Sequence, residues 1–415
     1  MQTIFDLSQT RALPSAHPTD SALPLPTVLL TNHGATGKPL PAPLGTQTIG
    51  GASDGALPTA PVHRALAAGA EPTGELCWNA RYRIGRCLGR GAQGVVYLAE
   101  REGVDGYSTH VALKVFHRPA GWSADEYLAE MRRLAQQGSY VSQIQHDNVI
   151  SIRDFVALGE NRVMVLEWID GIDLSHLLSL YRLRQLTRDL PERVRQHLFD
   201  VIVKEGRDHC CLKPGIAVDI LRGCLAGLAA LHHRGIVHCD LKPSNIMIKR
   251  TGTKKIIDID SSSVLESRVK YRRGTPYYMA PEQLSDGTVL LQSDIASLGY
   301  VLIEMLTGQM LFAHCTTTQK LLDAKRSLPA RLYQILPLDA QRDPILYELI
   351  RKMVAVDPRD RFPDADAAGF GRAGAARFER HLVKTNLSAD YDRELAWWLR
   401  LLTQSQSAKP RVLSP

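Results

Sequence analysis

The feature that most constrains the fold is the order of strand-like and helix-like segments after Ala80. Beyond Asp173 the pattern is mostly helical, whereas one predicted helix, 124–136, interrupts the strands that come before. Those short runs are separated mostly by turn signals, and they cover 82–88, 95–99, 111–116, 149–155 and 163–168. The sequence therefore predicts an α+β fold, with a small strand-rich lobe followed by a larger helical lobe.

Residues 1–74 differ in character, because they are rich in Pro, Ala, Thr and Gly and nearly free of aromatic residues. Such a composition buries too little apolar surface to offset the entropy of ordering the chain. We expect a disordered tail there, dispensable for the function of the folded part. One domain then spans 80–362, divided into lobes at 80–170 and 171–362, and a helical extension with its own tail covers 363–415.

Two further segments are candidates for contacts with partners. Residues 180–213 form a basic, partly helical stretch, for which a solvated surface insertion is favoured and a docking surface is the alternative. The predicted helix at 391–402 carries the adjacent Trp397 and Trp398, whose large apolar side chains need a cover. Packing against its own domain is favoured, and binding to a separate protein is the alternative.

Charge and cysteine content argue against several classes of function. The net charge is +7 at pH 7 and the pI is near 9.0, but Lys and Arg are scattered, so we expect no nucleic-acid binding. The 7 cysteines form no CxxC pair, which disfavours a disulfide framework or a zinc site. The first residues lack the charged region followed by an apolar region that marks a Sec signal peptide. The apolar stretch 295–306 is too short for a membrane span and contains Glu304, so no span is expected.

The first chemical motif is a glycine-rich turn between two predicted strands, LGRGAQGVVY from Leu88 to Tyr97. Gly89, Gly91 and Gly94 let a backbone hairpin approach phosphates closely, because no Cβ stands in the way. A GxGxxG pattern alone is weak, since a dinucleotide-binding fold also uses it. Here the chain continues as a strand instead of opening a helix, which argues against that alternative.

A lysine follows one hairpin later. Lys114 lies in the apolar run VALKV at 111–115, whereas a lone lysine on a strand usually faces solvent. Its apolar flanks and its place after the glycines predict that it reaches the α- and β-phosphates of a bound nucleotide.

The most informative stretch is HCDLKPSN, from His238 to Asn245. Asp240 can orient an attacking hydroxyl and accept its proton, Asn245 can ligate a metal ion, and Lys242 can neutralise charge on a phosphoryl group in transfer. Downstream, Asp258 in the short run IIDI is predicted to hold Mg²⁺ that bridges the phosphates. Two carboxylates, an amide and a lysine in this order after a glycine loop rarely arise by chance.

Together these motifs resemble the eukaryotic-type protein kinase superfamily over roughly 80–362. The motifs that carry the resemblance are LGRGAQGVVY, VALKVF, HDNVI, LEWIDGIDL, GIVHCDLKPSNIMI, IIDID, GTPYYMAPEQL, SDIASLGYVLIEMLTG and DPRDRF. The resemblance implies a two-lobed kinase fold with a small antiparallel β-sheet lobe. It also implies ATP as substrate, Mg²⁺ or Mn²⁺ as cofactor, and transfer of the γ-phosphate to hydroxyls of protein substrates.

Position by position, the resemblance implies further roles. Glu130 corresponds to the helix carboxylate that pairs with Lys114, with Glu126 as the alternative, and Glu282 corresponds to the partner of Arg361 in a structural ion pair. The implied ATP site is formed by Leu88, Gly89, Gly91, Gly94, Val96, Ala112, Lys114, Leu166, Glu167, Trp168, Asp173 and Met247.

Two features resemble the Ser/Thr type of protein kinase more than the Tyr type. They are Lys242, two residues after Asp240, and the pair Gly274-Thr275 before the Ala-Pro-Glu motif. Small-molecule kinases of related fold typically lack the GTPYYMAPE segment, which forms the platform for a peptide. Asp294 resembles the aspartate that anchors the catalytic loop.

The sequence departs from the family pattern at two positions. Cys239 stands where many kinases have an Arg that reads a phosphorylated activation loop, so regulation by loop phosphorylation is in question. Asp260 stands where the magnesium motif has Gly, which restricts the backbone and adds a negative charge. Either Asp260 points to solvent or it stiffens the loop in one state. An active enzyme is favoured, and a pseudokinase that works as a signalling scaffold is the alternative.

The Ala- and Arg-rich composition is typical of a GC-rich, bacterial genome. We expect a cytoplasmic bacterial signalling kinase. The alternative is a secreted effector delivered into a host cell, with the N-terminal segment as its secretion signal.

Overall fold

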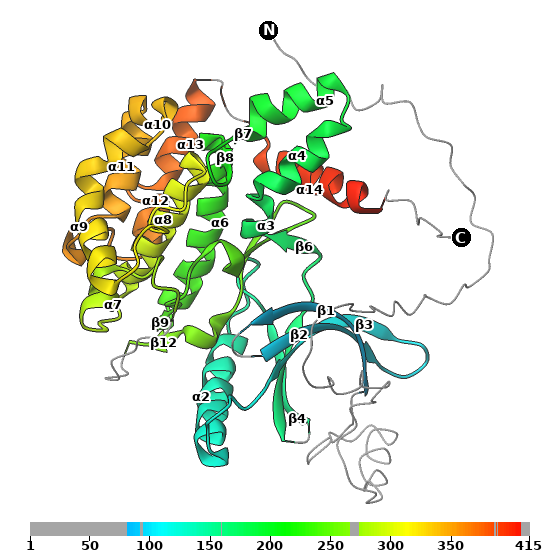
Figure 1. Cartoon of the computed structure of the whole chain (residues 1–415). Helices are drawn as coiled ribbons and strands as arrows, with labels where there is room; N and C mark the ends of the chain where they lie inside the picture. Colours follow the sequence, from blue (N-terminus) through cyan, green and yellow to red (C-terminus); the bar gives the residue numbers. More distant parts are fainter. Residues whose placement is uncertain are drawn as a thin grey trace, which may run out of the picture. The chain divides into compact units, whose positions relative to one another are not determined.

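The first lobe is built on a five-stranded antiparallel sheet in the order β1-β2-β3-β5-β4 (Figure 1). Its strands are Arg81–Gly91 (β1), Gly94–Glu102 (β2), Ser108–Phe116 (β3), Ile152–Leu158 (β4) and Asn161–Glu167 (β5). Successive residues of a strand point to opposite faces of the sheet. Accordingly Val163 and Val165 join one apolar cluster, whereas Met164 joins another on the opposite face.

The structure is a computed structural model that describes residues 81–91, 94–158, 160–265, 274–385, 387 and 389–407. The tail predicted at 1–74 lies outside the described residues, so that prediction stays open.

One helix, Ala124–Ser142 (α2), covers the Met164 face of the sheet. It begins with a capping box, in which the Ser123 hydroxyl accepts from the Glu126 amide at 3.1 Å and the Glu126 carboxylate accepts from the Ser123 amide at 2.7 Å. Buried Met131 and Leu134 then pack against Met164. The helix continues beyond its predicted end at residue 136, and this extra length matters for the site.

The second lobe is mainly helical, as the sequence predicts. Its helices are Leu174–Leu177 (α3), Leu180–Arg188 (α4), Glu192–His197 (α5), Pro214–His232 (α6), Pro281–Ser285 (α7), Leu291–Thr307 (α8), Thr318–Ile335 (α9), Leu338–Arg342 (α10), Pro344–Met353 (α11), Ala365–Phe370 (α12), Ala375–Lys384 (α13) and Tyr391–Ser407 (α14). Single helical turns occur at Leu198–Ile202 (η2), Pro243–Asn245 (η3), Ile259–Ser261 (η4) and Pro358–Asp360 (η5).

Short antiparallel strand pairs lie between these helices. The strands are Gly171–Asp173 (β6), Val203–Glu205 (β7), Cys210–Leu212 (β8), Ile236–Val237 (β9), Ile246–Lys249 (β10), Lys254–Ile256 (β11) and Ser263–Val264 (β12). β10 pairs with both β6 and β11, β9 with β12, and β7 with β8. The turn between β9 and β10 and the turn after β11 carry the predicted site residues.

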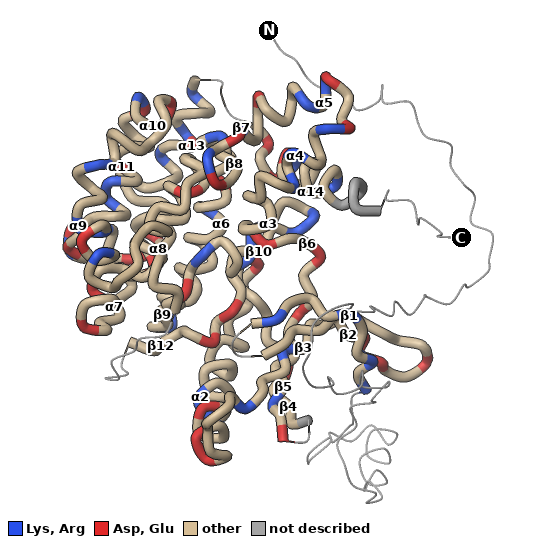
Figure 2. Tube along the Cα trace, in the orientation of Figure 1, with Lys and Arg blue, Asp and Glu red and all other residues tan. Residues whose placement is uncertain are grey.

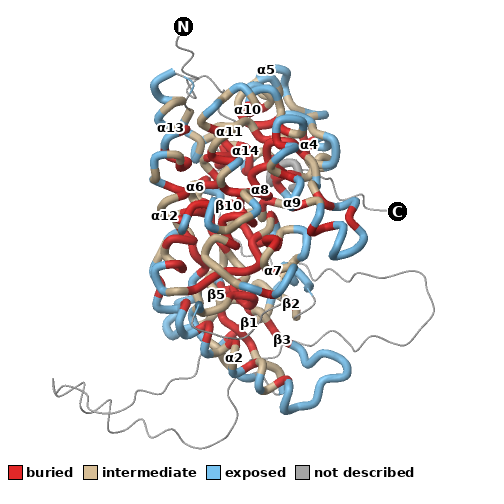
Figure 3. Tube along the Cα trace, turned by 90° about the vertical axis from the view of Figure 1, so that its left-hand side faces the viewer, coloured by how far each residue is buried: buried red, intermediate tan, exposed pale blue. Residues whose placement is uncertain are grey.

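Helices α6 and α8 form the centre of the helical lobe, where buried residues concentrate (Figure 3). Every residue of α8 from Ser293 to Thr307 is buried. Among the described residues, α6 is the one helix long and apolar enough to cross a membrane, and 61% of that window is buried inside the protein. Phe378 of α13 and Leu395 of α14 belong to the same core. The helices after residue 362 therefore share the core of the domain.

The C-terminal helix α14 packs on the segment 180–213, beside α4 and η2 (Figure 1). Trp398 is fully buried, and the Trp397 ring meets the His197 ring edge-on at 5.1 Å between centroids. His197 Nε2 lies 2.8 Å from a Glu394 carboxylate oxygen. The apolar face of α14 is thus covered by its own domain, the arrangement that the sequence analysis favours over a separate protein.

Basic residues of the segment 180–213 are partly neutralised within the fold. Arg184 pairs with Glu205 at 3.1 Å, and Lys204 pairs with Asp339 at 2.9 Å. Lys and Arg elsewhere are spread over both lobes among acidic residues (Figure 2). This distribution fits a solvated insertion.

The buried indole of α14 generates a stability prediction. Trp398→Ala leaves a large cavity in the core, and we expect the free energy of unfolding to fall by about 3–5 kcal/mol in a denaturant titration. The matched control is Trp122→Ala, since Trp122 is exposed and should cost far less. Equal losses for the two variants would contradict the docking of α14.

Candidate active site

Asp294, in the first turn of α8, fixes the backbone of the loop that carries Asp240. Its two carboxylate oxygens accept from the amides of His238 at 2.7 Å and Cys239 at 2.9 Å. Cys239 has a φ of 68°, in the left-handed region that costs a side-chain-bearing residue energy. Because Asp294 is fully buried, these two bonds are shielded from water and hold the strained turn in place. The predicted anchoring role of Asp294 agrees with this geometry.

Asp240 lies at the centre of a polar cluster. Its Oδ2 accepts from Lys242 Nζ at 2.8 Å and its Oδ1 from the Thr275 amide at 2.8 Å. The Asn245 side-chain amide donates to the Asp240 carbonyl at 2.8 Å and to Oδ2 at 3.2 Å. Lys242 also donates to the Thr275 hydroxyl at 2.8 Å. The three predicted residues of the HCDLKPSN motif therefore lie together, with Thr275 beside them.

Lys114 of β3 joins the sheet of the first lobe to the turn after β11. Its Nζ lies 2.7 Å from Asp258 Oδ1 and 2.5 Å from Asp260 Oδ2. The predicted proximity of Lys114 and Asp258 is confirmed. Asp260 is only 2% exposed, so the reading in which this carboxylate points to solvent is wrong.

Burial and charge shift the pKa values of these three groups in different directions. Burial alone would lower the pKa of Lys114, but the Asp260 and Asp258 carboxylates together raise it above its ordinary value. Burial would raise the pKa of Asp258, yet the Lys114 ammonium holds it below its usual range. Burial dominates at Asp260 and raises its pKa to about 6, against the attraction of Lys114.

The predicted pair between Lys114 and Glu130 needs correction. Lys114 forms its ion pairs with Asp258 and Asp260, whereas the Glu130 carboxylate is bound by Arg133 at 2.8 Å. The alternative, Glu126, caps the N-terminus of α2.

The physical reason for this correction is that both groups have other partners. The two carboxylates of the turn after β11 bind Lys114, and α2 side chains beyond Glu130 face that turn. Arg133 donates to the Asp260 carbonyl at 2.8 Å, and buried Gln137 donates to Ser262. Sequence reasoning missed Arg133 and Gln137, although the long stretch before His146 was a signal for them.

The glycine hairpin and its neighbours occupy the sheet as predicted. Gly91 pairs with Gly94 at the end of β1 and β2, and a Cβ on Gly94 would lie 2.0 Å from the Val115 carbonyl oxygen. Only glycine allows this close approach. The other predicted ATP-site residues are brought onto adjacent strands or loops by the pairings Val96–Lys114, Ala112–Leu166 and Asp173–Met247.

Three predicted ATP contacts have other interactions in this structure. The Glu167 carboxylate binds Lys255 at 2.5 Å and the Ser151 amide at 2.7 Å. The Trp168 ring packs on His110 with centroids 5.1 Å apart. Asp173 caps α3 by accepting from the His176 amide. Leu88, at the entrance of the hairpin, is exposed. The side chains of Glu167 and Asp173 therefore support the fold.

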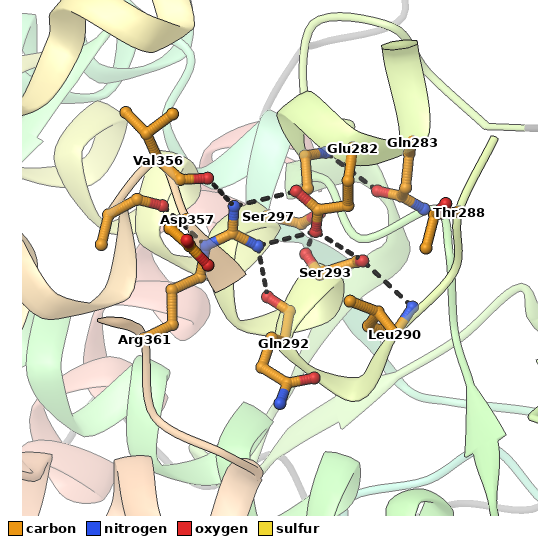
Figure 4. Close-up of polar contacts among 12 residues, drawn as sticks. Glu282, Gln283, Thr288, Leu290, Gln292, Ser293, Ser297, Val356, Asp357 and Arg361 are labelled. Atoms are coloured by element: carbon orange, nitrogen blue, oxygen red, sulfur yellow. Dashed lines mark hydrogen bonds and ion pairs between the residues drawn. The ribbon is translucent and has the colours of Figure 1, made fainter. Parts of the chain in front are cut away.

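Glu282 and Arg361 form the predicted structural ion pair, shown in Figure 4. Arg361 Nη1 and Nη2 bind the two Glu282 oxygens at 2.7 and 2.9 Å. The remaining guanidinium hydrogens go to the carbonyls of Gln292, Val356 and Ala355. All five N–H donors of the guanidinium are therefore satisfied. This bidentate pair joins α7 to the segment between η5 and α12.

The donor set fits a hard divalent metal ion. Asp258 and Asn245 offer a carboxylate and an amide oxygen, and Mg²⁺ prefers one or two such ligands together with substrate phosphates. In the part of the chain that the structure describes, no three His, Cys, Asp or Glu side chains form a metal cage. A metal site that is completed by the phosphates of a nucleotide does not need such a cage of side chains.

The fold and this cluster define a protein kinase, and sequence comparison agrees. The family model for the protein kinase domain matches residues 82–368. The chain therefore belongs to the protein kinase family. Protein kinase domains take ATP and a divalent metal ion, and the residues above supply the groups for both.

The chain is similar to serine/threonine-protein kinases and to a mitogen-activated protein kinase kinase kinase. The serine/threonine-protein kinase pkn2 of Myxococcus xanthus is 29% identical over 57% of this chain and 25% of its own length. The serine/threonine-protein kinase PrkC of Bacillus subtilis is 28% identical over 69% of this chain and 39% of its own length. Mitogen-activated protein kinase kinase kinase 1 of Arabidopsis thaliana is 29% identical over 68% and 40%. The first curated relatives are thus matched over 25% to 40% of their own length.

The Asp294 anchor generates the prediction of this subsection. Asp294→Asn replaces one acceptor oxygen by an NH₂ group that faces a backbone amide. An unsatisfied buried donor costs about 1–3 kcal/mol, so we expect a loss of that size in the free energy of unfolding and a fall in kcat. Asp360→Asn, at an exposed carboxylate, serves as the control. Unchanged stability and kcat in Asp294→Asn would show that the loop does not depend on this anchor.

Proposed function

We propose that this chain is an active protein Ser/Thr kinase. The observation that carries the proposal is the Asp240 carboxylate, held between Lys242 Nζ and the Thr275 amide, each at 2.8 Å. Lys114 and Asp258 meet at 2.7 Å, so the group proposed to hold the phosphates lies beside the group proposed to hold the metal. The groups proposed to act as base, to hold the phosphates and to hold the metal ion are therefore all present.

Each residue has a distinct part in the proposed reaction. Asp240 orients the substrate hydroxyl and takes its proton while the oxygen attacks the γ-phosphorus and the bond to the β–γ bridging oxygen breaks. Lys242 offsets negative charge on the transferring group. Lys114 holds the α- and β-phosphates. ADP leaves with the former bridging oxygen.

We propose Mg²⁺ as the ion, with Mn²⁺ as a substitute, held by Asp258 and Asn245. The bound ion would neutralise charge on the β- and γ-phosphates. The oxygen-only donor set supports this choice, because hard cations prefer oxygen ligands.

Specificity for Ser and Thr is supported by the contact between Lys242 and the Thr275 hydroxyl at 2.8 Å. Thr275 opens the segment that resembles a peptide platform, so this contact ties the catalytic loop to that platform. The identity of the protein substrates is not given by these residues.

The alternative is a pseudokinase scaffold, for which Asp260 in the magnesium motif is the one argument. The intact set of Lys114, Asp240, Asn245 and Asp258 speaks against it. For location we propose the bacterial cytoplasm, with delivery into a host cell as the alternative. A translocation reporter fused to residues 1–74 separates the two.

Asp240→Asn tests the proposed activity. The change keeps the size of the side chain but removes the base, and positioned acid–base groups contribute roughly 10²- to 10⁴-fold. We expect kcat for peptide phosphorylation to fall by that range while ATP affinity barely changes. Label from γ-labelled ATP should appear on Ser or Thr and be absent from Tyr. Asp360→Asn is the control, and transfer by Asp240→Asn at the wild-type rate would favour the scaffold.

A second prediction concerns regulation. Cys239 is a buried thiol whose pKa burial raises well above its ordinary value, and it offers no cation to a phosphorylated loop. The loop residues that could carry phosphate are Ser261, Ser262, Ser263, Ser267 and Tyr271. Of these, Ser261 and Ser262 are buried and Ser263 is half-buried, whereas Ser267 and Tyr271 lie outside the described residues. We expect activity without loop phosphorylation. Loss of activity on phosphatase treatment, restored by rephosphorylation, would contradict this.

A further inference from the structure

The turn after β11 presents two carboxylates to one lysine. Asp258 and Asp260 lie 2.7 and 2.5 Å from Lys114 Nζ. The Lys114 side chain is 11% exposed and that of Asp260 is 2% exposed, whereas that of Asp258 is 33% exposed. The more accessible carboxylate is the one proposed to hold the metal. The deeply buried carboxylate has Lys114 as its cationic partner.

Asp260 fits its place without strain. Ile259–Ser261 form a single 3-10 turn, and the residue with positive φ in this region is Asp258, at 62°. A side chain at residue 260 therefore meets no penalty of the left-handed region. The position does not require the glycine that the family pattern has there.

Helix α2 donates hydrogen bonds to the same turn from side chains that are not acidic. Arg133 donates to the Asp260 carbonyl at 2.8 Å, and the Gln137 amide donates to Ser262. Arg133 Nη1 also donates to Gln137 Oε1 at 2.6 Å. Within the described residues, the α2 side chains bonded to this turn are thus a cation and a neutral amide. Helix α2 therefore holds the turn through hydrogen bonds, while the turn itself supplies the negative charge beside Lys114.

Charge balance explains why a second carboxylate is needed. A buried ammonium requires a counter-charge, because desolvating it alone is costly. If Asp258 ligates a metal ion, it can no longer serve Lys114 fully. Asp260 then remains as the buried partner that keeps Lys114 in place.

We propose that Asp260 is the positioning residue that holds Lys114 toward the nucleotide phosphates, in the role that the family resemblance assigned to Glu130. The carboxylate that partners Lys114 therefore comes from the turn after β11 and not from helix α2, and the α2 residue Gln137 faces that turn as a neutral amide. This proposal rests on the proposed kinase function.

The test compares variants that remove or relocate the carboxylate. Asp260→Asn keeps the shape and removes the charge, and misplacing a phosphate-holding group costs up to about 100-fold. We expect a fall of about 10- to 100-fold in kcat, with the KM for peptide unchanged. The loss in Glu130→Gln should be smaller by about tenfold. Asp260→Gly should be as impaired as Asp260→Asn.

Binding of a fluorescent ATP analogue without turnover provides a second readout. Asp260→Asn and Lys114→Met should weaken this binding to a similar degree. Peptide binding is the control for folding: a variant that has lost peptide binding as well has a misfolded site, even if its melting temperature is unchanged. If the wild type binds nucleotide but transfers no phosphate, the kinase function fails while the binding comparison still tests Asp260. The proposal is overturned if Asp260→Gly is as active as the wild type or more active, or if Glu130→Gln loses as much as Lys114→Met.

Discussion

A buried lysine with two carboxylate partners is the interaction on which the site depends. Lys114 comes from the sheet of the first lobe, whereas Asp258 and Asp260 belong to the turn after β11. An uncompensated ammonium in this place would be expensive, so the sheet and the turn have to meet. That meeting joins the sheet that carries the glycine hairpin of β1 and β2 to the lobe that carries Asp240. The lysine therefore both joins the two lobes and prepares the site for phosphates.

The helical lobe supplies the rigidity that this arrangement needs. Asp294 of the buried helix α8 fixes the turn at Cys239 through two backbone bonds, and Arg361 fixes Glu282 through a bidentate pair. His238 extends the same framework, because its Nε2 donates to the Ile257 carbonyl at 3.0 Å. The base and the metal ligand are thus positioned by one continuous set of buried polar contacts, which are strong where water is excluded.

Much of the fold and the site could be predicted from the sequence, because both depend on local patterns. The GxGxxG hairpin, the run around Lys114 and the HCDLKPSN loop each carry their chemistry within a few residues. The partner of Lys114 could not be predicted in this way. It depends on which side chains meet when β3 and the turn after β11 pack together, and residues that lie 144 and 146 positions apart carry no local pattern for that contact. From the sequence, Asp260 could only be recognised as a departure from the Gly of the magnesium motif. Its burial against Lys114 is a tertiary contact, which no local pattern indicates.

The central claim is that Asp260, and not a carboxylate of α2, holds Lys114 during nucleotide binding. A crystal structure of the chain with Mg²⁺ and a non-hydrolysable ATP analogue tests it most directly. We expect Asp258 on the metal ion, Asp260 within about 4 Å of Lys114 Nζ, and Glu130 still bound by Arg133. A structure in which Lys114 pairs with Glu130 and the Asp260 side chain has left the lysine would contradict the account.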